Sequence, residues 1–297
     1  MSVGKMIKGY LAVILSAVIY GCMPLMAKHI YADGVTPLML VFLRNFLALP
    51  VVAVMALLQT RSLKLNPKLL TRVSLSGLLG SCITPVLMYV SYQYIASGTT
   101  TVFHFIYPAI VVLIGLLLKE EKLKWGNVLG VVLCFVGVCL FYSPDGSLDW
   151  RGTIPAIASG FTYGAYVVLL AHSDAKKVPS FLFAFYVALT CTVAMFIVCI
   201  ATGQFVFPHT AAGWGWAFLF SIGITCGAVV LFQLGTFMIG GQQASILSAL
   251  EPLTSVIVGI AVLGEPSGLR TWLGSACVIL ATVVIGVYNF KKVQRRK

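Results

Sequence analysis

The chain has 297 residues, of which 60% are apolar and only 9% are charged, whereas soluble domains have about 45–50% apolar and about 25% charged residues. With a mean hydropathy of +1.00, this composition excludes a soluble globular fold. The net charge of +12 would suit nucleic-acid binding, but no basic face interleaved with exposed aromatic residues remains once the apolar stretches are marked. We therefore expect a polytopic helical membrane protein with no nucleic-acid partner.

The polar breaks divide the chain into apolar stretches long enough to cross a hydrocarbon core of about 30 Å. The first stretch is too long for a signal-peptide core and has no small-residue cleavage site after it, so we expect it to remain as a helix. Ten transmembrane helices are predicted, at residues 9–30, 37–59, 73–95, 98–118, 124–142, 152–171, 180–202, 213–238, 243–263 and 269–290.

The basic residues predict the orientation of these helices. An even number of spans places both termini on one side, and that side holds 16 of the 20 Lys and Arg residues. Three others, Lys28, Arg151 and Arg270, lie on the opposite side, and Arg44 lies within the second span. Because cytoplasmic loops are enriched in basic residues, we expect a plasma (inner) membrane protein with both termini in the cytoplasm.

The sequence also repeats itself at a shift of 142 to 144 residues. The matching pairs include Tyr20 with Tyr163, Pro37 with Pro179, Cys82 with Cys226, Pro108 with Pro252, and Glu121 with Glu265. This pattern predicts a five-helix repeat at residues 1–145 and a second one at 146–297, with a basic tail. Because five is odd, the second repeat would be inverted in the membrane, an arrangement typical of transporters.

No cofactor or metal is expected. The eight cysteines lie in apolar runs without a CxxC pair or a neighbouring His, and no phosphate-binding loop or separate soluble module is present for ATP hydrolysis. A membrane-embedded enzyme is disfavoured because the chain lacks an aspartyl pair, a GxSxG serine and a metal-spaced His/Glu cluster. A sensor or scaffold without transport is not excluded by these patterns.

Three ionisable residues, Arg44, His104 and Glu251, lie deep within predicted spans, where a charge costs about 2.5–3.5 kcal/mol near the centre. Glu251 lies about eight residues into the ninth span, ~12 Å from its edge, and could bind a substrate amine, carry a coupling proton or form a structural ion pair. Arg44 could bind an anion or extend to the interface. His104, flanked by aromatic residues, could line a cavity or serve in packing.

Further polar and aromatic residues could line the same cavity, although interhelical hydrogen bonding is an equal alternative for each. The predicted set is Tyr20, Tyr89, Tyr92, Phe103, Tyr107, Tyr163, Gln233, Ser245 and Ser248. Pro108 and Pro252 each remove one helical hydrogen bond, so they predict bends, and Gly115 and Gly259 predict close helix packing.

Three segments carry a family resemblance. Tyr107-Pro-Ala-Ile and its continuation to Glu121, together with Leu250-Glu-Pro-Leu and its continuation to Gly264-Glu265, resemble the EamA branch of the drug/metabolite transporter superfamily, as does the stretch that begins Arg44-Asn-Phe-Leu-Ala. The resemblance implies a central cavity between spans one to four and six to nine, with spans five and ten peripheral. It also implies export or facilitated passage of small metabolites, often amino acids. His104 departs from the small or apolar residues common at this position.

The expected function is a secondary transporter that moves a small organic metabolite by alternating access around a cavity at the middle of the membrane. The tyrosines favour an amino acid with an aromatic side chain, or a related amphiphile. A proton antiporter for drugs or cationic metabolites is the alternative. The expected partners are the small-molecule substrate, the lipid bilayer and protons in the coupled case, and the expected state is a monomer or weak dimer.

Overall fold

The computed structural model describes residues 3–118, 125–140, 149–239, 244 and 247–294. These residues form a bundle of helices, as the composition predicts. The first part contains α1 (Val3–Gly21), α2 (Met23–Ala32), α3 (Pro37–Thr60), α4 (Pro67–Gly77), the π-helix η1 (Leu78–Ile83), α5 (Thr84–Ser91), α6 (Ser97–His104), α7 (Tyr107–Leu117) and α8 (Trp125–Leu140). The remainder contains α9 (Trp150–His172), the 3₁₀ helix η2 (Asp174–Lys177), α10 (Ser180–Ala201), α11 (Ala211–Ser221), the π-helix η3 (Ile222–Ala228), α12 (Val229–Ile239), α14 (Leu250–Ala261) and α15 (Leu269–Gln294).

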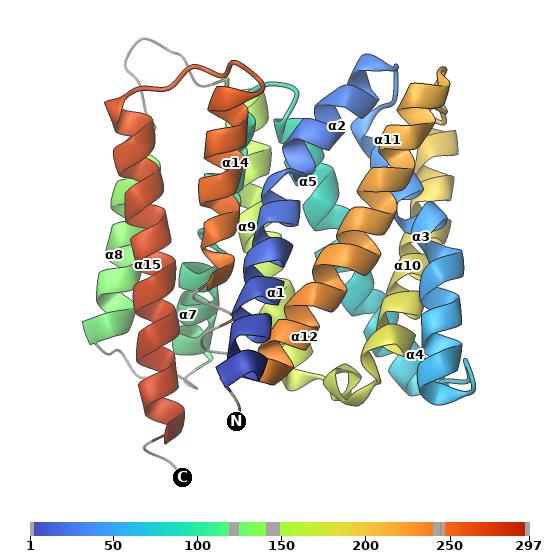
Figure 1. The fold of residues 1–297 in the computed structure, drawn as a ribbon, viewed down its shortest axis with the longest axis horizontal. Helices are drawn as coiled ribbons and strands as arrows, with labels where there is room; N and C mark the ends of the chain where they lie inside the picture. The colour runs from blue at the N-terminus through green and yellow to red at the C-terminus, as the bar shows by residue number, and fades with distance from the viewer. Residues whose placement is uncertain (1–2, 119–124, 141–148, 240–243, 245–246, 295–297) are drawn as a thin grey trace.

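Within the part of the chain that the structure describes, seven helical stretches are long and apolar enough to cross a membrane, and three shorter apolar helices lie at Val128–Leu140, Leu250–Ala261 and Leu269–Ile285. The polytopic all-helical fold class is therefore confirmed, whereas the number of ten crossings stays a prediction. Helix α1 begins and α15 ends at the same end of the bundle (Figure 1). Below, this end is called the termini end, and the opposite one the far end.

Several helices begin where the sequence provides a capping side chain. Thr36 accepts a hydrogen bond from the backbone nitrogen of Met39, and Pro37 occupies the first turn of α3. Asn66, Asp149 and Thr210 cap α4, α9 and α11 in the same way. A capping oxygen satisfies a backbone N–H that has no partner within the helix, so these helix starts follow directly from the local sequence.

The predicted fourth span corresponds to one apolar stretch, Ser97–Leu117, which contains two helices. Helix α6 ends at His104 and α7 begins at Tyr107, with Pro108 in its first turn. Proline has no N–H and cannot donate to the backbone ladder. His104, Phe105 and Tyr107, at the junction of these helices, line the central cavity. Pro252 lies in the first turn of α14 in the same manner.

The two helices α8 and α15 pack against each other at one side of the bundle (Figure 1). A Cβ atom added to Gly130 would collide with the side chain of Ile285, and one added to Gly137 would lie 2.7 Å from the side chain of Val278. The described parts of α8 and α15 contribute no residue to the central cavity. They lie at the periphery, as the resemblance implies.

Candidate substrate cavity

A cavity of about 370 Å³ lies between the central helices. Its wall is built from α1, the start of α2, α3, η1, α5, the α6–α7 junction, α9, α10, η3, α12 and α14. The polar residues that line it are Ser16, Tyr20, Arg44, Asn45, Ser81, Thr84, His104, Tyr107, Tyr163, Tyr166, Ser180, Thr225, Ser248 and Glu251. Its size is within the range of small-molecule sites.

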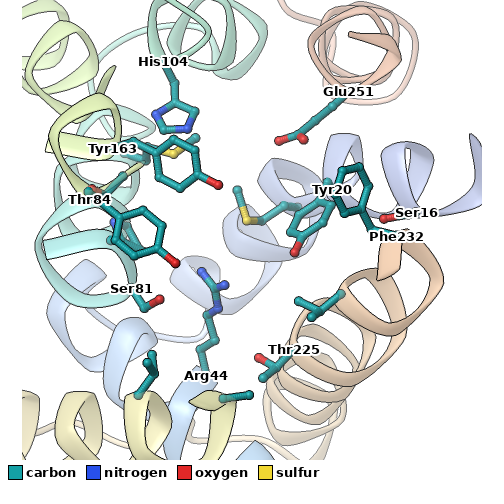
Figure 2. Close-up of a pocket in the computed structure, with 18 of the residues that line it drawn as sticks. Ser16, Tyr20, Arg44, Ser81, Thr84, His104, Tyr163, Thr225, Phe232 and Glu251 are labelled. Atoms are coloured by element: carbon teal, nitrogen blue, oxygen red, sulfur yellow. The ribbon is translucent and has the colours of Figure 1, made fainter. Parts of the chain in front are cut away.

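Two groups of opposite charge point into this space from different walls. Figure 2 shows the guanidinium of Arg44 on α3 and the carboxylate of Glu251 on α14 facing the same interior. Arg44 donates a hydrogen bond from Nη1 to the hydroxyl of Tyr89 at 3.0 Å, so its side chain does not extend to the interface. Among the residues that the structure describes, no ion pair or hydrogen bond involves the carboxylate of Glu251.

Aromatic rings cover the wall beneath His104. The imidazole centroid lies 5.2 Å from that of Tyr163 and 5.8 Å from that of Tyr107, and the two tyrosine rings are 4.8 Å apart in an edge-to-face arrangement. Nδ1 of His104 lies 3.1 Å from Oγ of Ser159 on α9. This wall presents a large aromatic surface with few charges.

Two π-helices flank the cavity. The segments η1 and η3 begin at Leu78 and Ile222, which are 144 residues apart, the same shift that relates the predicted repeats. Hydroxyl groups bind backbone carbonyls of both segments: Thr84 donates to Leu79 at 2.8 Å, and Ser16 donates to Ala228 at 2.7 Å. Because π-helical turns are rare and concentrate at functional sites, their presence on both sides of one cavity supports its role.

The structure brings most of the predicted site residues together. Seven of them line the cavity: Tyr20, Arg44, His104, Tyr107, Tyr163, Ser248 and Glu251. Tyr89, Tyr92 and Phe103 are buried away from its surface. Gln233 lies on α12, and its side chain, like the whole of Ser245, is outside the described residues. The functional roles of these residues stay predictions.

Several further polar residues that were not predicted from the sequence also line the cavity, namely Asn45, Ser81, Thr84, Tyr166 and Thr225. A signal for two of them was available. Ser81 and Thr225 occupy equivalent positions at the shift of 144 and directly precede the matched pair Cys82 and Cys226. The hydroxyl of Thr225 is buried and has no hydrogen-bond partner among the described residues.

The far end of the bundle is closed by contacts that join the two predicted repeats. Glu265, in the loop after α14, pairs with Lys28 of α2 at 2.5 Å. The same carboxylate accepts hydrogen bonds from the backbone nitrogen and the hydroxyl of Ser97 at 2.9 and 2.7 Å, at the start of α6. A Cβ atom on Gly259 would collide with this carboxylate, so the predicted packing glycine of α14 makes room for Glu265.

Burial alone would raise the pKa of Glu265, but its hydrogen bonds with Lys28 and Ser97 outweigh burial and hold the pKa below its usual value. Glu265 is therefore a charged acceptor that links three segments. Deeper in the bundle, Tyr31 of α2 donates a hydrogen bond to the backbone oxygen of Tyr89 at 3.1 Å. Tyr89 is fully buried, and it contacts both Arg44 at the cavity and α2.

The helical membrane fold, the central polar cavity and the peripheral helix pair together define a polytopic membrane transporter. The family model for the EamA-like transporter family matches residues 7–143 and again residues 150–287. The chain belongs to this family.

Curated relatives and a solved structure agree with this assignment. The chain is 28% identical over 282 residues to an uncharacterized transporter of Archaeoglobus fulgidus, covering 93% of this chain and 95% of the relative. It is 21% identical over 290 residues to an uncharacterized transporter of Clostridium kluyveri, covering 93% and 92%. A solved crystal structure superposes on this chain with a TM-score of 0.65 at 16% sequence identity. The match covers 93% of this chain and 95% of the other chain, which shows that the two share a fold.

Proposed function

We propose that the protein is a secondary transporter that carries a small zwitterionic amphiphile by alternating access, and that an amino acid with an aromatic side chain fits its cavity best. The observation that carries this proposal is the placement of Arg44 and Glu251 in one cavity whose remaining wall is rich in aromatic rings. Arg44 would bind the carboxylate of the substrate, and Glu251 its ammonium group. The proposal assigns no chemical transformation to the site.

Electrostatics favours a zwitterion over a singly charged solute. A charged side chain within a membrane is costly unless a partner or water compensates it, and Arg44 and Glu251 do not pair with each other in the described structure. A substrate that bears both charges would compensate both residues at once. A solute with one charge would leave the other residue uncompensated.

The closed and open ends of the cavity support alternating access. The contacts of Tyr89 and Glu265 close the far end, whereas the cavity lining reaches Ser180, the first residue of α10, towards the termini end. With the basic residues concentrated on the side of the termini, we propose an inward-facing state of an inner-membrane protein with both termini in the cytoplasm. Export would then begin from this state.

A second candidate function rests on Glu251 alone. A buried carboxylate without a protein partner can exchange a proton with the substrate during a transport cycle. In that case the protein would be a proton antiporter for cationic compounds, and Arg44 would serve only to position Tyr89.

The test is solute flux in proteoliposomes that contain the full chain. Labelled tryptophan, tyrosine, phenylalanine and a monovalent aromatic amine would be compared with and without a pH gradient. Flux of the zwitterions in excess of the amine supports the proposal, and gradient-independent flux identifies a facilitator. Flux of the amine alone favours the antiporter. Absence of flux for all four compounds contradicts the proposal. Asp174→Asn, at an exposed acid outside the cavity, serves as the control variant.

A further inference from the structure

His104 is oriented by a residue that does not itself line the cavity. Ser159 is fully buried on α9, and its hydroxyl donates a hydrogen bond to the backbone oxygen of Ala156 at 2.6 Å. A hydroxyl group has one proton. Ser159 can therefore only accept from Nδ1 of His104, which lies 3.1 Å away. The contact requires that Nδ1 carry a proton.

The opposite nitrogen of the ring is then an acceptor. The side chain of His104 is 7% exposed and makes no ion pair with a carboxylate in the described structure, and burial without such a partner favours a neutral ring. In a neutral imidazole with its proton on Nδ1, Nε2 presents a lone pair. No hydrogen bond joins Nε2 to another residue of the described chain, and the ring extends from α6 into the cavity (Figure 2).

The surroundings of this acceptor indicate which part of a substrate it would meet. The nearest rings are those of Tyr163, Tyr107 and Phe105, with centroids 5.2, 5.8 and 6.1 Å from that of His104. Arg44 and Glu251 project from other walls. A zwitterion held by these two charges would place its aromatic side chain, rather than its charged groups, beside His104.

We propose that His104 is a specificity-determining residue that accepts a hydrogen bond from an N–H or O–H group on the aromatic ring of the substrate. The carrier would then prefer phenol- and indole-bearing zwitterions over analogues with a hydrocarbon ring. Ser159 is a positioning residue that keeps the proton on Nδ1. This inference rests on the proposed function.

The expected preference follows from the cost of leaving an acceptor unpaired. A hydrocarbon ring would displace water from Nε2 without replacing its hydrogen bond, whereas a phenol or indole would replace it. A site built to bind a donor group rejects the analogue that lacks it, and an unpaired buried polar group corresponds to a loss of roughly tenfold to hundredfold in affinity.

The experiment measures flux ratios for two pairs of compounds in proteoliposomes: tyrosine against phenylalanine, and tryptophan against 1-methyltryptophan. Wild type would be compared with His104→Phe, His104→Gln and Ser159→Ala. His172→Phe, at an exposed histidine at the end of α9 outside the cavity, is the matched control. We expect wild type and the control to favour the donor-bearing compound by about tenfold or more in at least one pair.

In His104→Phe the ratio is expected to fall towards one while phenylalanine flux is retained, which also shows that the variant folds. His104→Gln keeps an acceptor and should retain part of the preference, and Ser159→Ala should reduce it. A wild-type ratio near one in both pairs, or an unchanged ratio in both His104→Phe and Ser159→Ala, would overturn the inference alone. Absence of flux for all four compounds would overturn the proposed function and this inference with it.

Discussion

Two walls of the cavity occupy equivalent positions in the predicted repeats but differ in chemistry. At a shift of 144 residues, His104 corresponds to Ser248 and Tyr107 corresponds to Glu251. All four residues line the cavity. The α6–α7 wall therefore presents neutral aromatic groups where the α14 wall presents a hydroxyl and a carboxylate.

The backbone that carries these side chains is more alike than the side chains are. Pro108 and Pro252 lie in the first turns of α7 and α14. A glycine packs against the backbone oxygen at each wall: a Cβ on Gly164 would lie 3.3 Å from the oxygen of Tyr107, and one on Gly21 would lie 2.9 Å from that of Glu251. Both walls therefore have a similar packing framework but different side-chain chemistry, which in the proposed function would orient a polar substrate.

The largest expected effect comes from removing the negative charge of Glu251 on α14. Glu251→Gln should reduce flux of zwitterionic substrates by roughly hundredfold, because it leaves the substrate ammonium without a buried counter-charge. An N-acetylated substrate, which has no ammonium group, should be far less affected. The measurement is exchange flux in proteoliposomes at fixed pH. If exchange survives and only gradient-driven uptake is lost, Glu251 carries a coupling proton instead.

The next effect concerns Arg44, which has no charged equivalent 142 to 144 residues later. Arg44→Gln should weaken binding of a carboxylate-bearing substrate by roughly tenfold to hundredfold, because a charged hydrogen bond is lost. Arg44→Lys should lie between this variant and wild type, since an ammonium cannot bind a carboxylate through two parallel bonds. The measurement is calorimetric titration of the purified proteins with a substrate and with its amide, which has no carboxylate. If Arg44 acted only on the fold, the substitution would weaken the affinity for both compounds equally.

The duplicated framework can be tested by adding one methyl group at each wall. Gly21→Ala should destabilise the protein by about 1–3 kcal/mol, because its Cβ would lie 2.5 Å from the side chain of Thr254 as well as near the backbone. Gly164→Ala should cost less, since its closest contact is 2.9 Å, to the end of the Ile110 side chain. Thermal unfolding in detergent would show which of the two variants loses more stability. The control is Gly215→Ala, whose added Cβ would have no atom within 4 Å, so it should be neutral or slightly stabilising. A larger loss of stability in Gly164→Ala than in Gly21→Ala would contradict the prediction.

The smallest effect is expected at the far end, beyond the α14 wall. Glu265→Gln should lower stability by about 1 kcal/mol and leave substrate selectivity unchanged. Because the folded-state pKa of Glu265 is lowered, its contribution is complete above the usual value of 4.5 and is lost as the pH falls through the lowered pKa. The difference in melting temperature between wild type and variant should therefore shrink in acid. A difference that is constant with pH would show that the charge of Glu265 is not involved.

The sequence predicted most of the fold because the bilayer imposes simple rules on length and polarity. The observed helices Pro37–Thr60 and Ser180–Ala201 differ from the predicted spans by about one residue at their ends. The third span is predicted to start at residue 73, whereas α4 begins at Pro67 after the capping residue Asn66. The predicted start is too late because the residues in the first turns of α4 are polar, and hydropathy does not assign polar residues to a span.

The site was predicted less completely because its lining depends on backbone geometry that hydropathy does not encode. Arg44, His104 and Glu251 stood out because ionisable residues are rare in apolar spans. Ser81 and Thr225 did not, because hydroxyl residues commonly serve in helix packing, and it is the π-helical turns that place both at the cavity. Tyr89 was predicted to line the cavity and instead lies behind Arg44 as its hydrogen-bond partner.

Because Arg44 donates a hydrogen bond to Tyr89, its guanidinium takes part in two equilibria: the binding of a ligand in the cavity and the release of Tyr89. The same group faces the cavity and donates to Tyr89, whose backbone oxygen accepts a hydrogen bond from Tyr31 of α2; in the proposed cycle, release of Tyr89 would open the far end. A ligand that binds Arg44 more tightly after Tyr89 has been released must favour the state in which Tyr89 is released. Because linkage between two equilibria is reciprocal, release of Tyr89 must increase the affinity for that ligand by the same factor. Occupancy and opening would then be two readouts of a single coupling free energy.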